Sequence, residues 1–200
     1  MGEKNARFTA YKDDLRAKSE YFHGVRTRGH EDQTVSLNDT FPDVGETEFR
    51  AYMYWVDKGV LHLDSPRDVL YRRGGVQRAR LYVLATKLKD VGLRKLLIRE
   101  FVRVYASPTA TRLPGRDAMN YLYDQIDEKT ALHKLLVDLY VARVDRDLYE
   151  RQMSEYTNKF RDGFGLKAAR RAGREPRQRI VDALGSYLAD ESEGGSDGED

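Results

Sequence analysis

The 200-residue sequence contains no cysteine, and this absence excludes several classes of protein. Disulfide frameworks, thiol nucleophiles and zinc or iron–sulfur centres held by thiolates all require cysteine. Long apolar runs are also missing. The longest covers residues 81–85, far short of the roughly 18 residues that span a bilayer. No signal peptide is recognisable at the start of the sequence, so by elimination we expect a protein of the cytosol or nucleus, with no membrane partner.

A strong excess of one charge is missing as well. Lys and Arg total 35, Asp and Glu total 33, and the formal net charge is +2, so the whole-chain charge gives no argument for a nucleic-acid partner. The distribution is uneven, however. Residues 159–179 are strongly basic and residues 190–200 are strongly acidic, and we expect the two segments to neutralise one another. Nucleic-acid binding through the basic segment is the alternative, with a basic patch formed by Lys167, Arg170, Arg171, Arg174, Arg177 and Arg179.

The motifs that usually carry catalysis are absent from the sequence. There is no H-E-x-x-H, no P-loop and no dinucleotide-binding glycine pattern. The four histidines, His23, His30, His62 and His133, do not form a pair with metal-ligand spacing, so we expect all four to be solvated. The sequence therefore predicts a protein that is not an enzyme, with no catalytic residue, metal, cofactor or small-molecule substrate.

Apolar residues recur mostly at helical spacing. Between residues 49 and 56 they follow the pattern i, i+3, i+4, i+7, which predicts an amphipathic helix that stops at Gly59. The alternation of polar and apolar residues at 34–37 instead predicts one short strand. We therefore expect an α+β protein that is mainly helical and has a small β-sheet.

Further helices are predicted downstream. The glycine pair at 74–75 predicts a break ahead of an apolar stripe at 81–88, and a second stripe at 93–104 forms a helical hairpin with the first. The stripe at 132–140 is the most regular in the chain. Thr130 stands where it can cap the N-terminus of that helix.

Several segments resemble those of BTB/POZ domains, in the same order along the chain. Residues 8–22 (FTAYKDDLRAKSEYF) resemble the family's first helix with its Ser-x-Tyr-Phe ending, and 35–37 resemble its short strand. Residues 49–61 (FRAYMYWVDKGVL) resemble the pattern F-x-x-x-L-x-W-L-Y-x-G-x-L. Residues 81–97 (LYVLATKLKDVGLRKLL) are the strongest match and resemble fungal members, as does the helical extension suggested by 116–144.

The sequence departs from the family pattern at its start. Tyr11 stands where the family usually has histidine, and Thr86 where it often has aspartate. Only seven residues precede Phe8, which is too few for the β-hairpin that usually opens the domain, so we expect a truncated sheet.

The resemblance implies a fold and a division of the chain. The fold is a BTB/POZ-like helical cluster with a small, truncated sheet, followed by a helical extension. The predicted segments are a BTB/POZ-like domain at 1–107, a helical extension at 108–165, a basic linker with a short helix at 166–189, and a disordered acidic tail at 190–200.

The resemblance also implies a function. Family members associate with copies of themselves, link substrates to cullin-type ubiquitin ligases, or join transcriptional complexes. The sequence is thus interpreted as a protein–protein interaction module that forms a homodimer or acts as an adaptor. Because accessible aromatic side chains dominate association energies, the candidate interface residues are Tyr11, Tyr21, Tyr52 and Trp55.

Overall fold

The computed structural model describes residues 12–24, 44–63, 73–107, 110, 113–126, 130–142, 156–161, 164, 180 and 183–193. Within these ranges the regular structure is helical, and none of them contains a β-strand. The expectation of a small sheet is therefore wrong for the described part of the chain, where helices alone surround the core. The strand predicted at 34–37 lies outside the described residues. The expectation of a mainly helical chain is confirmed.

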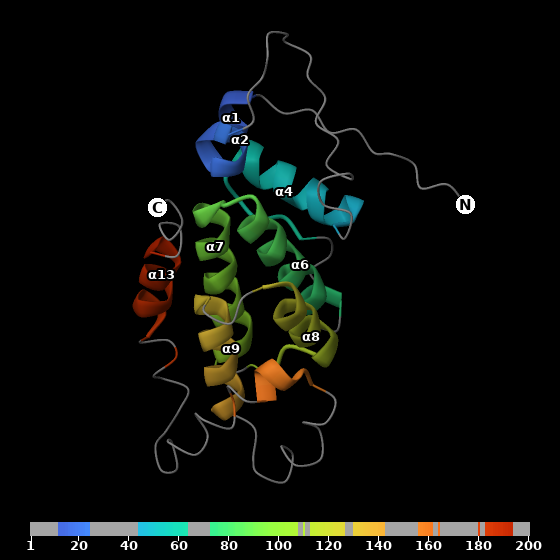
Figure 1. Ribbon diagram of the computed structural model, residues 1–200, viewed down its shortest axis with the longest axis vertical. Helices are drawn as coiled ribbons and strands as arrows, with labels where there is room; N and C mark the ends of the chain where they lie inside the picture. Colours follow the sequence, from blue (N-terminus) through green and yellow to red (C-terminus); the bar gives the residue numbers. More distant parts are fainter. Residues whose placement is uncertain are drawn as a thin grey trace, which may run out of the picture.

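The described helices fall into three groups (Figure 1). The first group comprises α1 (Lys12–Lys18), α2 (Glu20–Gly24) and α4 (Glu46–Lys58). The second comprises α6 (Arg73–Lys87), α7 (Val91–Phe101), the π-helix η1 (Val102–Ala106) that continues α7, α8 (Arg116–Gln125) and α9 (Ala131–Val141). The last helix is α13 (Leu184–Glu193).

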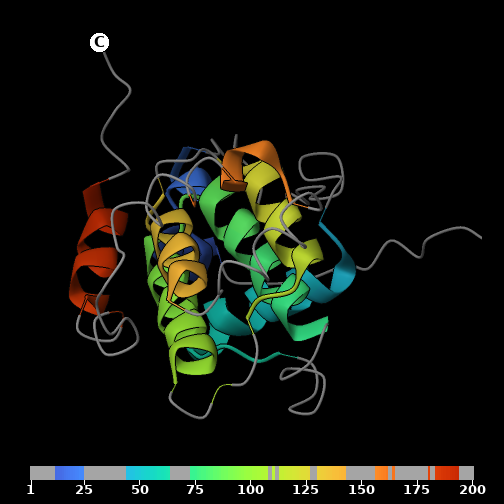
Figure 2. The same cartoon turned by 90° about the horizontal axis from the view of Figure 1, so that it is seen from below.

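The second group forms the body of the molecule. α6 packs against both α7 and α8, while α4 crosses one end of α6 with α1 beside it (Figure 1). α13 packs against α7 and α9 and lies at the outer flank of the bundle, as Figure 2 also shows. None of the helices in the described ranges is both long enough and apolar enough to cross a membrane.

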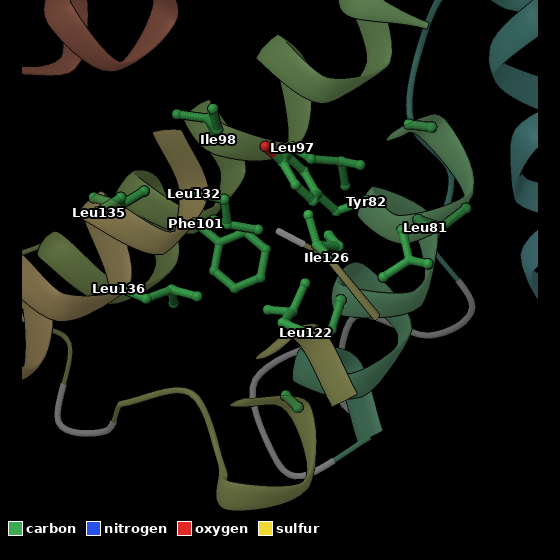
Figure 3. Close-up of a cluster of buried hydrophobic side chains, with 14 of the residues drawn as sticks. Leu81, Tyr82, Leu97, Ile98, Phe101, Leu122, Ile126, Leu132, Leu135 and Leu136 are labelled. Carbon is green, nitrogen blue, oxygen red and sulfur yellow. The ribbon is translucent and has the colours of Figure 1, made fainter. Parts of the chain in front are cut away.

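The core lies where α6, α7, α8 and α9 meet. Phe101 of α7 sits at the centre of the group drawn in Figure 3 and is completely buried. The side chains labelled around it are equally buried or nearly so, and they come from all four helices and from Ile126, just after α8: Leu81, Tyr82, Leu97, Ile98, Leu122, Ile126, Leu132, Leu135 and Leu136. Each large apolar side chain removed from water in this way stabilises the fold by about 1.5–3 kcal/mol.

Two of the predicted helices are confirmed together with their ends. α4 stops at Gly59, whose φ of +67° is left-handed and whose backbone N–H donates to the carbonyl oxygen of Trp55 at 2.8 Å. α9 begins after Thr130, whose hydroxyl oxygen accepts a hydrogen bond from the backbone N–H of His133. Local sequence signals therefore determine these helix ends.

The glycine pair at 74–75 does not break the chain as expected, because α6 already begins at Arg73. Gly75 is buried inside the first turn of that helix. A Cβ atom at this position would lie 3.0 Å from the hydroxyl oxygen of Tyr105 and 3.8 Å from the Cβ of Ala118. The glycine therefore lets α6 approach η1 and α8 closely.

The disordered tail predicted for residues 190–200 is wrong for residues 190–193. α13 continues to Glu193, so residues 190–193 are helical, and the side chain of Glu191 is buried. The physical reason is that Asp190 and Glu191 form ion pairs with cations of α9 and α7. Residues 194–200 lie outside the described part of the chain.

Candidate interaction sites

The four aromatic residues predicted for an interface occupy different environments. Tyr11 lies outside the described residues. Tyr21 is half-buried and packs edge-on against Phe22, with ring centroids 5.2 Å apart. Tyr52 and Trp55 are only 1% and 8% exposed. Their expected accessibility is wrong, because the side of α4 that carries them faces the body of the molecule rather than solvent.

The buried aromatic residues instead help to build a contact around the turn between α6 and α7. The hydroxyl of Ser19 donates to the carbonyl oxygen of Leu88 at 2.5 Å, and the backbone N–H of Tyr21 approaches the same oxygen at 3.4 Å. The indole N–H of Trp55 donates to Oδ2 of Asp90 at 2.9 Å. Residues from three of the segments that carry the resemblance therefore meet at this one turn.

Asp90 is the buried acid at the centre of that contact. Its Oδ1 accepts a hydrogen bond from the backbone N–H of Leu93 at 2.8 Å and so caps α7. Burial raises the pKa of Asp90 above the ordinary value of 3.8, whereas the hydrogen bonds from Leu93 and Trp55 and the charges of Lys18 and Arg94 oppose the shift. The Lys18 ammonium lies 4.5 Å from the centre of the Trp55 ring, a cation–π contact.

We expect Asp90 to make stability depend on pH in a definite direction. Because its folded pKa is raised, its favourable contribution is fully present below about pH 3.8 and is lost as the pH rises through the folded value. In Asp90→Asn this site is neutral at every pH. The free energy of unfolding of the native protein, minus that of Asp90→Asn, should therefore fall with rising pH. Urea unfolding of both proteins between about pH 4 and pH 7 measures this difference. If the two free energies of unfolding changed in parallel with pH, the prediction would be contradicted.

An exposed apolar area lies at the end of α4 and just beyond it. Tyr54 is 41% exposed and Val60 is 53% exposed, and the ring of Tyr54 lies 5.1 Å from that of His62. We call Tyr54, Val60 and His62 the Tyr54 surface. None of these three residues is among the predicted interface residues. The signal for Tyr54 is nevertheless in the sequence, because Tyr54 falls outside the apolar stripe at 49–56 that marks the buried side of α4.

A second site is the contact between α13 and the body of the molecule, which is built around the buried carboxylate of Glu191. Arg94 Nη1 lies 3.0 Å from Oε2 of Glu191, and Arg94 Nη2 donates to the Glu191 carbonyl oxygen at 3.4 Å. The hydroxyl of Tyr82 donates to Oε1 of the same side chain. Burial, together with the nearby Glu191, raises the pKa of Tyr82 well above its ordinary value, so this phenol stays protonated and can donate.

Two further polar contacts hold α13. The hydroxyl of Tyr187 donates to Oδ2 of the buried Asp138 at 2.5 Å. Lys134 Nζ lies 2.8 Å from Oδ2 of Asp190 in a pair that is partly open to solvent. We call the four residues of the body that make these polar contacts, Tyr82 of α6, Arg94 of α7, and Lys134 and Asp138 of α9, the α7–α9 face. Sequence reasoning identified none of them, since their partners are 49 to 109 residues away along the chain.

The histidines divide between solvent and core. His23 and His62 are exposed as expected, and His30 lies outside the described residues. The solvated environment expected for His133 is wrong. It is 3% exposed, and its ring lies 4.2 Å from that of Tyr123. Among the described residues, no group of three or more histidines and acids is arranged to hold a metal ion.

The predicted basic patch cannot be placed, because all six of its members lie outside the described residues. These are Lys167, Arg170, Arg171, Arg174, Arg177 and Arg179. Nucleic-acid binding through 159–179 therefore stays a prediction. Comparison with protein-family models, with curated proteins and with solved structures gives no match.

Proposed function

We propose that this chain is a BTB/POZ-like protein–protein interaction module of the cytosol or nucleus. It self-associates, or it acts as an adaptor that joins a partner to a cullin-type scaffold or a transcriptional complex. The observation that carries the proposal is the contact at the α6–α7 turn. There Ser19 reaches Leu88 across 69 positions of sequence, and Trp55 reaches Asp90 across 35.

This contact supports the proposal because it gives the matched residues a shared physical role. Their polar groups bond to one another inside the molecule, which stabilises the arrangement of α2, α4, α6 and α7. The side chains that contact a partner must therefore lie elsewhere, on the surface of the molecule. Among the described residues the Tyr54 surface supplies the exposed large apolar side chains, a type that contributes strongly when a partner covers it.

Light scattering coupled to size-exclusion chromatography on the full chain tests the proposal across a dilution series. A second arm titrates the protein with a purified cullin-type scaffold. A concentration-dependent dimer, or a complex with the scaffold, is the expected result. A protein that stays monomeric throughout and does not bind the scaffold would overturn both the self-association and the role as a cullin adaptor. The full chain is needed because ending it at residue 165 would remove α13 and uncover α7 and α9.

A matched pair of variants locates the contact. Val60→Glu puts a charge into the Tyr54 surface, and Thr47→Glu adds the same charge at an exposed position near the start of α4. We expect Val60→Glu to raise the dissociation constant of the dimer or scaffold complex at least about tenfold, since burying an unpaired charge is costly. Thr47→Glu should leave it unchanged. Equal affinities for both variants would place the contact elsewhere.

A further inference from the structure

α13 is a poor helix by itself. It has ten residues, includes Gly185 in its first turn, and has no basic residue in its last turn. Its acidic residues Asp190, Glu191 and Glu193 lie instead near the C-terminal end, where the helix dipole disfavours negative charge. Isolated helices shorter than about 12–15 residues are marginal even in favourable sequences. The contacts that α13 makes must therefore supply most of its stability.

Those contacts match charge with charge and donor with acceptor. Asp190 pairs with Lys134 of α9, and Glu191 pairs with Arg94 of α7. Tyr187 and Glu191 are four residues apart and so lie on the same side of α13. The α7–α9 face is thus complementary to a short acidic helix that carries tyrosine and glutamate at positions i and i+4.

The connection to α13 is long enough to reach another molecule. Phe164 and Ile180 are both buried, and 15 residues separate them in the sequence. At about 3.3–3.6 Å per residue, a segment of that length spans up to about 50 Å when extended. A second copy of the chain presents an identical α13 to an identical face, which is the situation in which helices exchange between protomers.

We propose that the α7–α9 face is a helix-binding site and that two copies of this chain dimerise by exchanging α13. This inference rests on the self-association proposed above and adds to it a second contact between copies, separate from the Tyr54 surface. Each α13 occupies its own face at low protein concentration, because the linker keeps it at a high effective concentration there. The same contacts form between copies when the protein is concentrated or when the contact within one chain is weakened.

Complementary charge reversals test the exchange in the full-length protein. Arg94→Glu and Glu191→Arg each place like charges at the buried pair, so α13 is repelled from its own face in either variant. When the two variants are mixed, both exchanged contacts have opposite charges. We expect the 1:1 heterodimer, identified by native mass spectrometry, to be at least tenfold more abundant than the homodimer of either variant. The double variant, which restores the pair within one chain, should behave as the native protein does.

A second pair of variants covers the case in which the buried reversals do not fold. Lys134→Glu and Asp190→Lys reverse the solvent-exposed pair of the same contact, where added charge is tolerated. Their mixture should enrich the heterodimer at least threefold over either variant alone. If folded variants of either pair give no enrichment on mixing, helix exchange is overturned. A native dimer that persists alongside that result would leave the interaction module standing and remove only this mechanism.

Discussion

Trp55→Ala should be about 3–5 kcal/mol less stable than the native protein, as is typical when a large buried aromatic residue is truncated. The indole ring is 8% exposed and lies in contact range of Gly92, where an added Cβ would stand 3.3 Å from ring atom Cζ2. It also carries the Lys18 ammonium on its face and donates to Asp90. Removing the ring loses these contacts together. Urea unfolding followed by circular dichroism measures the change.

Trp55→Phe separates packing from hydrogen bonding. Phenylalanine keeps most of the apolar volume but has no N–H, so Asp90 loses one donor while it remains buried. We expect this variant to lose about 1–3 kcal/mol, the cost of leaving a buried polar group without a partner. Because the sequence contains one tryptophan, tryptophan fluorescence cannot follow unfolding in either variant. A Trp55→Ala protein no less stable than Trp55→Phe would show that packing around the ring contributes little.

Arg94→Ala should release α13 from the body of the molecule. The substitution leaves the carboxylate of Glu191, whose side chain is 1% exposed, without its cation. Keeping that charge buried would cost about 3–5 kcal/mol. Undocking α13 hydrates the carboxylate instead, so the loss of stability is limited to the free energy of docking. Hydrogen exchange should show loss of protection in residues 184–193 and unchanged protection in α6.

Arg99→Ala is the matched control, because Arg99 is an exposed arginine on the same helix and α13 does not depend on its charge. It should leave the exchange of 184–193 as it is in the native protein. Retained protection of α13 in Arg94→Ala would contradict the role given to the buried ion pair. In that case Tyr82, Tyr187 and Lys134 would be sufficient to hold the helix.

The helices that could be predicted are those whose signals are local. In α4 and α9 the apolar spacing, the glycine after one helix and the threonine before the other all lie within the segment itself. The apolar stripe at 49–56 likewise indicates which side of α4 faces the core, and Tyr52 lies on that stripe. The prediction that Tyr52 is accessible is wrong because an aromatic residue on such a stripe more often belongs to the core than to an interface.

Features that depend on distant partners were not predictable in the same way. Glu191 lies in an acidic run that is typical of a solvated tail, and its partner Arg94 lies 97 positions earlier in the sequence. The stripe at 93–104 gave no sign that α7 continues as a π-helix from Val102. The wider turn of η1 accompanies the burial of Tyr105 beside Gly75, which is again a contact between separate segments.

The position of α13 in the chain has a consequence for synthesis on the ribosome. Leu184 follows Val141, the last residue of α9, by 43 residues. At about 5–20 residues per second, α13 leaves the ribosome roughly 2–9 s after α9. Helices pair far faster than this, so α7 and α9 meet while Arg94 and Asp138 still lack their α13 partners. Where ribosomes follow one another closely on a message, a neighbouring nascent chain can provide the missing helix first.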